Sequence, residues 1–235
     1  MIKLLIFDMD DTIINHGHMS YPAWIKTGEK LVADYHLDID GTLLGKRIGK
    51  GSESLYNNED TRPKVNYSPY EVRYKIIKEA LDDLKIELAN EYIDYLIKEY
   101  DSVKKEMVCV YDDVFTTLAS LKEKGYILAL LTNGDSKFQR EKIKRFDLDP
   151  HFDYTFVSGE IGVDKPHRKA YEIVCNKCGV KLNETCMIGD NYLWEAAAPK
   201  KYGLTSVWVN RTGYDKEDNQ ADYTIENIRD LLKYF

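Results

Sequence analysis

Three aspartates stand close together at the end of the first apolar run of the chain. The sequence opens MIKLLIFDMDDT, so Asp8, Asp10 and Asp11 directly follow a short run of large apolar residues. Carboxylates this close repel one another unless a cation compensates their charge. The cluster is therefore either a solvated surface feature or the binding site of a metal ion, and the rest of the chain must decide between the two.

Other polar residues take the same place after later apolar runs. A hydroxyl and an amide follow the run 126–131, a lysine opens the helix after the run 154–157, and another acid follows the run 185–188. In open α/β sheets, ligands bind outside the carboxyl ends of the strands. If these runs are parallel strands, the polar residues gather with the first aspartates at one edge of a sheet. The residues concerned are Thr132, Asn133, Lys165 and Asp190.

Apolar runs and helical segments alternate from about residue 110 to the end of the chain. Such alternation predicts a mostly parallel sheet with right-handed crossovers, sandwiched by helices in a Rossmann-like α/β fold. Helices are expected over 113–124, 167–178 and from about 193, with a last one at the C-terminus. The expected strands are 3–7, 126–131, 154–157, 185–188, 206–209 and 223–225.

The segment between the first two strands has only helical periodicity. Helices are expected over 22–35, over 69–84 with Ser68 as the cap, and from a cap at Asn90. The last of these has one apolar face, made of Ile93, Leu96, Ile97, Tyr100 and Val103. The sequence therefore predicts an α/β core of residues 1–14 and 110–235 with an inserted all-α cap domain of residues 15–109.

The overall charge limits the classes of partner. The formal net charge is −7, and lysines and acids are interspersed along the chain, which argues against nucleic acid and against an anionic membrane surface. No apolar stretch is long enough to span a bilayer, and the four cysteines are too irregular for a disulfide framework. We expect a cytoplasmic protein, either a monomer or a small homo-oligomer.

Four motifs, in their order along the chain, resemble those of the haloacid dehalogenase (HAD) superfamily. They are FDMDDT, LLTNG, GVDKP and MIGDNYLWE. Members of this superfamily also place a helical cap between the first motif and the second strand, as this sequence does. The chain thus resembles the phosphatase branch with a helical, type C1 cap, and the resemblance implies a hydrolase acting on a small phosphorylated metabolite.

The resemblance also implies catalytic roles. Asp8 would be the nucleophile that becomes an aspartyl phosphate, and Asp10 would be the general acid and base. Thr132 and the backbone amide of Asn133 would bind the transferring phosphoryl group. Lys165 would balance charge on the nucleophile and bind the phosphate. The dehalogenase branch has no acid two residues after its nucleophile, so Asp10 favours phosphate esters over carbon–halogen bonds.

The implied cofactor is Mg²⁺, which prefers hard oxygen ligands. The resemblance assigns it the side chains of Asp8 and Asp190 and the backbone carbonyl of Asp10. Glu195, five residues after Asp190, would support the metal through water or directly. The sequence departs from the family pattern at Asp11, where glycine is commoner, and this residue bears on the local backbone geometry.

One stretch of the insert suggests a substrate contact. GKRIGKGS (45–52) is one residue too short between its glycines for a phosphate-binding P-loop, and no strand precedes it. We expect a flexible basic loop in which Arg47 or Lys50 holds the far end of the substrate. The substrate classes left open are phosphoglycolate, triose or sugar phosphates and nucleoside monophosphates. The alternative functions are a phosphomutase of the same superfamily and a non-catalytic phosphometabolite-binding protein.

Overall fold

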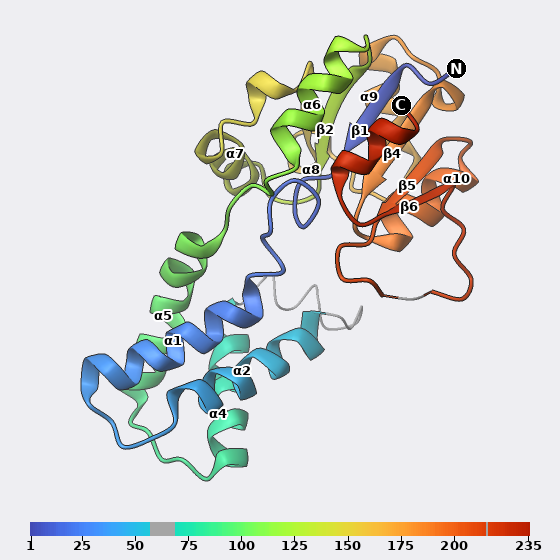
Figure 1. Cartoon of the computed structure of the whole chain (residues 1–235). Helices are drawn as coiled ribbons and strands as arrows, with labels where there is room; N and C mark the ends of the chain where they lie inside the picture. Colours follow the sequence, from blue (N-terminus) through green and yellow to red (C-terminus); the bar gives the residue numbers. More distant parts are fainter. Residues whose placement is uncertain (57–68, 215) are drawn as a thin grey trace. The chain divides into compact units, whose positions relative to one another are not determined.

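The chain forms two compact units, and it passes from one to the other twice. The computed structural model describes residues 1–56, 69–214 and 216–235 (Figure 1). Met1–Asn15 and Cys109–Phe235 make up one unit, here called the core unit. His16–Val108 make up the other, the helical insertion, which the chain enters after its first strand.

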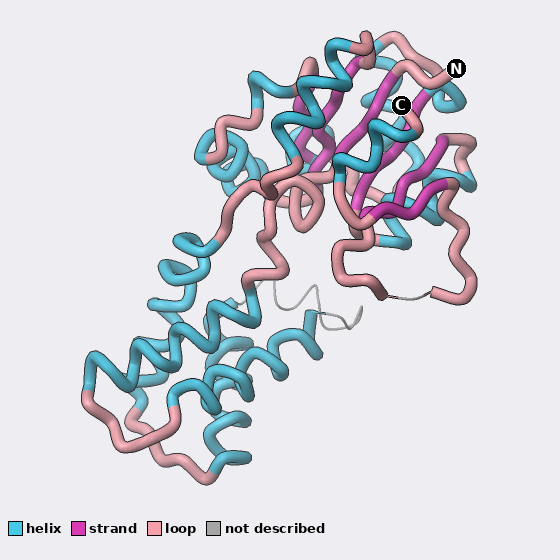
Figure 2. Tube along the Cα trace, viewed as in Figure 1, coloured by secondary structure: helices cyan, strands magenta, loops and turns pink. Residues whose placement is uncertain are grey.

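The core unit is built on a six-stranded sheet whose described strand pairs are all parallel, in the order β3-β2-β1-β4-β5-β6 (Figure 2). The strands are β1 (Leu4–Phe7), β2 (Ile127–Thr132), β3 (Tyr154–Val157), β4 (Thr185–Gly189), β5 (Thr205–Val209) and β6 (Tyr223–Ile225). Phe7, the last residue of β1, pairs with Leu130 of β2 and Ile188 of β4. The α/β fold expected from the alternating pattern is confirmed, and the first strand lies inside the sheet between the second and the fourth.

Helices cover the two faces of this sheet. Successive strand residues point to opposite faces, and β1 is buried along its whole length because both faces are covered. On one face Leu4 and Ile6 pack with Tyr171 and Val174 of α9 (Arg168–Cys178). Figure 1 shows α6 on the other side of the sheet. The remaining helical segments of this unit are α6 (Val114–Glu123), α7 (Ser136–Arg145), η1 (Asp149–His151), α8 (Ser158–Ile161), η2 (Leu182–Glu184), η3 (Tyr192–Ala197), α10 (Ala198–Lys201) and η4 (Ile228–Lys233).

Two of these segments differ in type from the expected α-helices. The segment η3, directly after β4, is a π-helix that continues into the single turn of α10. The C-terminal segment η4 is a 3-10 helix. Helical periodicity in a short segment does not distinguish these types, because they differ by less than one residue per turn from the α-helix.

The helical insertion has its own hydrophobic core. Its described helices are α1 (Ser20–Tyr35), α2 (Gly41–Tyr56), α4 (Pro69–Leu84) and α5 (Asn90–Met107). Trp24 of α1 stacks on Tyr100 of α5 with ring centroids 3.9 Å apart. The buried face of α5 consists of the five apolar residues expected from the sequence. Asn90 does not cap this helix, since Ala89 occupies the N-cap and the Asn90 side chain instead accepts a hydrogen bond from Tyr74. The expected cap at Ser68 lies outside the described residues.

The expected flexible basic loop is instead part of helix α2, and that prediction was wrong. Its glycines allow close packing of helices: a Cβ on Gly45 would lie 2.4 Å from the carbonyl oxygen of Trp24, and one on Gly28 would lie 2.2 Å from that of Gly41. The absence of a side chain thus lets α1 and α2 approach closely, and Ile48 is fully buried. Glycines that suggest a loop in the sequence are here positions at which helix α2 packs against helix α1.

No helix in the described part of the chain combines the length and apolarity needed to cross a membrane.

Candidate active site

The end of β1 holds an aspartate and a lysine in a buried ion pair. Asp8 follows β1 directly, and its side chain is about one-tenth exposed. The Nζ of Lys165 lies 2.5 Å from Asp8 Oδ1 and 2.9 Å from Glu195 Oε1. The side chains of Lys165 and Glu195 are each 1% exposed. One buried ammonium group therefore bridges two buried carboxylates.

The electrostatics of this group keep the lysine charged. Burial by itself would lower the pKa of Lys165, but the carboxylates of Asp8 and Glu195 outweigh that effect, so its pKa lies above the ordinary value. Burial raises the pKa of Asp8, and the charge of Lys165 only partly offsets it. Burial likewise raises the pKa of Glu195 to about 7, against the effect of Lys165. One lysine thus does not fully offset the cost of burying two ionised carboxylates.

A second acid is fixed beside Asp8 by the sheet register. Because Phe7 pairs with Ile188, the residue after Gly189 lies next to the end of β1. The Thr12 hydroxyl donates to Asp190 Oδ1 at 3.0 Å and accepts from the Asp190 backbone N–H at 2.9 Å. Burial, followed by the charges of Asp8 and Glu195, raises the pKa of Asp190 well above its ordinary value. A cation near this carboxylate would relieve that repulsion.

Asp10 is held by two residues of helix α7. The Nζ of Lys142 lies 2.6 Å from both carboxylate oxygens of Asp10. The amide Nε2 of Gln139 lies 3.2 Å from Asp10 Oδ2, 2.8 Å from Thr132 Oγ1 and 2.5 Å from the Asn133 carbonyl oxygen. Gln139 thus connects the loop after β1 with the end of β2.

The Asn133 side chain fixes the position of the lysine. Its Nδ2 donates to the Lys165 carbonyl oxygen, and its Oδ1 accepts from the Lys165 backbone N–H, both at 2.8 Å. This two-point contact holds the segment before α9 against the end of β2. The side chain of Asn133 therefore positions Lys165, and its expected contribution through a backbone amide to phosphoryl binding stays a prediction.

The backbone of the first loop explains the unusual Asp11. This residue has φ 61°, a left-handed conformation that glycine adopts without strain and that aspartate tolerates better than most residues. Arg211 supports the same loop from the segment after β5, since it donates to the Thr12 carbonyl oxygen and to Asp113 Oδ1, each at 3.1 Å. Its guanidinium carbon lies 3.7 Å from the ring centroid of Tyr111. The loop that contains Asp8 and Asp10 is therefore held in place by a residue about 200 positions later in the chain.

The residues expected to bind a metal offer a suitable set of oxygens. Two carboxylates, Asp8 and Asp190, and a backbone carbonyl, that of Asp10, are hard donors of the kind that Mg²⁺ prefers. Within the described ranges, no group of three His, Cys, Asp or Glu side chains is arranged to hold a metal ion. Glu195 Oε1 pairs with Lys165, whereas its buried Oε2 has no hydrogen-bond partner. This unpaired oxygen and the excess negative charge fit a site for a divalent cation.

Several residues of the site were missed by reasoning from the sequence. Thr12 lies inside the FDMDDT motif and could have been singled out there. Gln139 and Lys142 have the three-residue spacing of one helix face shortly after the second strand, but this spacing does not show that the face meets Asp10. Arg211 has no comparable signal, because its role depends on contacts with distant segments. Arg47 lies on α2, where its guanidinium pairs with Asp83, and Lys50 is exposed on the same helix.

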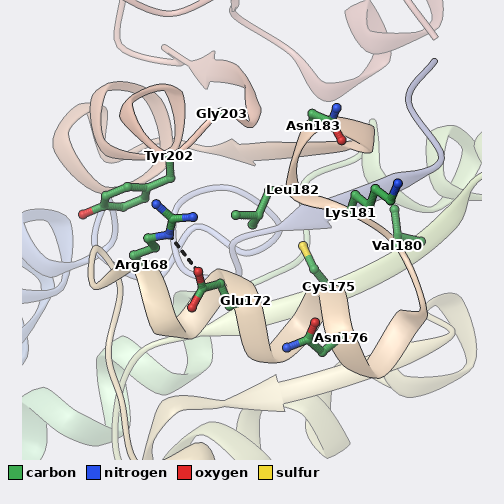
Figure 3. A pocket seen from close by; sticks show the side chains of 10 residues that line it. All are labelled: Arg168, Glu172, Cys175, Asn176, Val180, Lys181, Leu182, Asn183, Tyr202 and Gly203. Atoms are coloured by element: carbon green, nitrogen blue, oxygen red, sulfur yellow. Dashed lines mark hydrogen bonds and ion pairs between the residues drawn. The ribbon is translucent and has the colours of Figure 1, made fainter.

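A hollow of the core unit lies apart from these residues. It runs along α9 and the loops that lead into β4 and β5 (Figure 3). Arg168, Cys175, Lys181 and Tyr202 are among its lining residues, and Arg168 forms an ion pair with Glu172, one turn further along α9. None of the predicted catalytic side chains lines this hollow, so it is not the site formed by the strand ends.

Comparison with known proteins agrees with this geometry. The family model for haloacid dehalogenase-like hydrolases matches residues 2–203. A glyceraldehyde 3-phosphate phosphatase of Methanocaldococcus jannaschii is 29% identical over 243 aligned positions, which cover 99% of this chain and 96% of that protein. A phosphoserine phosphatase of Thermus thermophilus is 26% identical and covers 98% of each chain.

The fold has a similarly wide match among solved structures. The magnesium-bound HAD-hydrolase YfnB of Bacillus subtilis superposes with a TM-score of 0.71 at 20% identity, covering 99% of this chain and 98% of that chain. The match supports the α/β core with a helical insertion after β1. With the family model covering most of the chain, this protein belongs to the haloacid dehalogenase-like hydrolases.

Proposed function

We propose that this hydrolase is a Mg²⁺-dependent phosphatase that cleaves a small phosphomonoester through an aspartyl phosphate on Asp8. The observation that carries the proposal is the buried contact of Asp8 with Lys165, close to the Thr12–Asp190 pair. A carboxylate that attacks a phosphate dianion meets charge repulsion, and only a site with fixed positive charge overcomes it. Lys165 provides one such charge next to the nucleophile.

The first chemical step transfers the phosphoryl group to the protein. An oxygen of Asp8 forms a bond to phosphorus as the bond to the ester oxygen breaks, and Lys165 neutralises the negative charge at the nucleophile. Asp10 gives its proton to the departing ester oxygen, which leaves as an alcohol. The Thr132 hydroxyl donates a hydrogen bond to the phosphoryl group and orients it for the in-line reaction.

The second step restores the enzyme. Asp10, now a carboxylate, accepts a proton from a water molecule as the water oxygen attacks the phosphorus of the aspartyl phosphate. The bond between phosphorus and Asp8 breaks, and inorganic phosphate leaves. Asp10 is then protonated again, so the same side chain serves as acid and base in turn.

The residues that would hold Mg²⁺ are Asp8, Asp190 and the backbone carbonyl of Asp10. When bound, the ion supplies positive charge that screens the phosphate oxygens from the nucleophilic carboxylate. Thr12 and Trp208 prepare this site, because Thr12 fixes the Asp190 side chain and the Trp208 indole N–H donates to the Asp190 carbonyl oxygen at 2.8 Å.

The substrate class is a small phosphorylated metabolite. The full-length relatives are named for activity on glyceraldehyde 3-phosphate and on phosphoserine, and another relative, from Homo sapiens, is an N-acylneuraminate-9-phosphatase. These names share a phosphomonoester on a small polar carbon skeleton. Asp10 favours an ester over a carbon–halogen bond, because a halide leaves without needing a proton. A phosphomutase, which would keep water from the aspartyl phosphate, is the alternative within the same chemistry.

The test is turnover of p-nitrophenyl phosphate with and without Mg²⁺. We expect wild-type activity that disappears when the metal is chelated, and an Asp8→Asn variant that has lost turnover while its circular dichroism spectrum is unchanged. Asp11→Asn is the comparison variant, since it makes the same change in the same loop and asparagine also tolerates the left-handed backbone of that position. Turnover by Asp8→Asn close to the wild-type rate would exclude the aspartyl-phosphate mechanism. Absence of turnover in folded, metal-loaded wild type would favour the non-catalytic binding protein.

A further inference from the structure

We propose that Gln139 and Lys142 of α7 are positioning residues that set the orientation of the Asp10 carboxyl group and the Thr132 hydroxyl for proton transfer and phosphoryl binding. The inference rests on the phosphatase function proposed above and adds two residues that lie outside its four motifs. Neither residue contacts the reacting atoms directly in this assignment; both act through the groups that do.

Lys142 restricts the rotation of Asp10. Its ammonium nitrogen is 2.6 Å from both carboxylate oxygens, so it favours one orientation of the carboxylate plane. The Lys142 side chain is 17% exposed and that of Asp10 is 30% exposed, so the pair is only partly open to solvent. The rate enhancement from a general acid depends on its alignment with the leaving oxygen. A small displacement of the acid therefore loses much of this enhancement.

Gln139 orients the Thr132 hydroxyl. Its amide nitrogen has two hydrogens, which are shared among Asp10 Oδ2, Thr132 Oγ1 and the carbonyl oxygen of Asn133. Because Thr132 Oγ1 accepts from this amide, the hydroxyl hydrogen of Thr132 is directed to a different acceptor. In the catalytic complex that acceptor would be a phosphoryl oxygen. Gln139 is itself 5% exposed, so water competes little for its amide.

The local structure of α7 explains why these two side chains face the strand ends. The Asp135 side chain caps the helix by accepting from the Phe138 backbone N–H. Gly134 has φ 132°, and a Cβ there would lie 3.1 Å from the Gln139 amide nitrogen, so the absence of a side chain leaves room for the amide. Residues three apart lie on the same helix face, which aims Gln139 and Lys142 in one direction.

The assignment predicts a dependence on the leaving group. A leaving group that is stable as an anion, such as p-nitrophenolate, departs without a proton from Asp10. A more basic leaving group, such as phenolate, depends on that proton. Misaligned Asp10 should therefore impair phenyl phosphate much more than p-nitrophenyl phosphate, although the two substrates are nearly the same size. A purely structural defect would lower turnover of both substrates alike.

The experiment measures kcat/KM for these two substrates with saturating Mg²⁺. For Lys142→Met we expect a loss of roughly 10- to 100-fold with phenyl phosphate, a part of the usual general-acid contribution, and a loss within about threefold with p-nitrophenyl phosphate. Lys142→Arg should recover most of the loss, since it restores the cation. Lys144→Met, the same change at an exposed position of α7, is the matched control and should leave both values unchanged.

Gln139→Leu has a different expected pattern. Because Thr132 contacts the phosphoryl group that both substrates share, kcat/KM should fall for both, with a further loss for phenyl phosphate through Asp10. Thermal unfolding of each variant reports whether the fold is kept.

Equal losses of the two substrates in Lys142→Met, with wild type active on both, would overturn this assignment and leave the phosphatase function standing. Losses in Lys144→Met that match those in Lys142→Met would also overturn it. Absence of Mg²⁺-dependent turnover in wild type would instead overturn the proposed function, and this assignment with it.

Discussion

The core unit contains a cluster of buried charges, whereas the ion pairs described in the helical insertion lie at its surface. In the core unit, Asp8, Lys165 and Glu195 are buried together, and both carboxylates depend on Lys165 for compensation of their charge. In the helical insertion, the ion pairs join side chains on helix surfaces, such as Arg73 with Asp101, whose carboxylate side chain is 66% exposed. Exposed pairs contribute little to stability, whereas a buried charge that loses its partner is very costly. A buried cluster of this kind is what the proposed chemistry at Asp8 requires.

The largest effect that tests this contrast is expected at Lys165. Lys165→Met would leave Asp8 and Glu195 as buried acids without a cation, and removal of one partner of a buried pair costs about 3–5 kcal/mol of unfolding free energy. Phosphatase turnover should also be lost. Urea unfolding and turnover of p-nitrophenyl phosphate check both expectations.

Lys169→Met is the control for that change. Lys169 is exposed on α9, four residues away, so its replacement by the same side chain should alter stability by less than about 0.5 kcal/mol. If the two variants lost the same amount of stability, the buried ion pair would have no special role, and the contrast between the two units would fail.

The fold of the core unit was predictable because its signals are local. Each strand is a short apolar run ended by polar residues, and the left-handed glycines Gly125 and Gly179 end α6 and α9 where the sequence indicates. The positions of Asp8 and Asp190 at one sheet edge follow from a parallel sheet, whose strands all have their carboxyl ends at that edge. For these residues, the order of strands and polar residues along the chain was sufficient to predict that they share one sheet edge.

The parts that were not predicted depend on contacts between distant segments. Helix α2 was mistaken for a loop because glycine, here Gly45, is a poor helix former. The structure shows that a larger residue at this position would collide with the α1 backbone at Trp24. Asp10 was found from its spacing, whereas its partner Lys142 is 132 residues away along the chain. A single sequence does not show which side chain of a helix will reach a given carboxylate.

A smaller effect is expected at the close contact of α1 and α2 in the helical insertion. Gly45→Ala would place a methyl group 2.4 Å from the Trp24 carbonyl oxygen, which is rigid backbone, and overpacking of this kind costs about 1–3 kcal/mol. Gly51→Ala is the milder comparison, because its methyl group would lie 2.9 Å from Cγ2 of Ile76, a side-chain atom, instead of 2.4 Å from a backbone carbonyl oxygen. Urea unfolding measures both variants. A Gly45→Ala variant as stable as Gly51→Ala would refute the packing role of Gly45.

The surface charges of α2 provide a test of the remaining substrate prediction. Arg47 pairs with Asp83 in an exposed contact that is easily given up, so Arg47 is available to a phosphorylated ligand at little cost. We predict that Arg47→Ala and Lys50→Ala each raise KM several-fold for the best substrate in a metabolite screen, and less for p-nitrophenyl phosphate. Lys46→Ala, at an exposed position of the same helix, is the control. Equal changes for both substrates would dismiss a role of Arg47 and Lys50 in recognition.

The smallest expected effect on stability concerns an exposed ion pair of the core unit. It tests whether burial, and not location in the core unit, decides how much an ion pair contributes. Glu160 belongs to the core unit, yet its side chain is 35% exposed, and hydrogen bonds from Arg140 and then Ser136 lower its pKa to about 2. A carboxylate with a lowered folded pKa stabilises the protein above its unfolded pKa, and this contribution is lost as the pH falls towards 2. Wild type should therefore exceed Glu160→Gln in unfolding free energy by less than about 1 kcal/mol at pH 7, with the difference shrinking below about pH 4.5. Urea unfolding at a series of pH values measures it. A difference as large as that of Lys165→Met, or one that grows in acid, would mean that exposure does not decide the strength of these pairs.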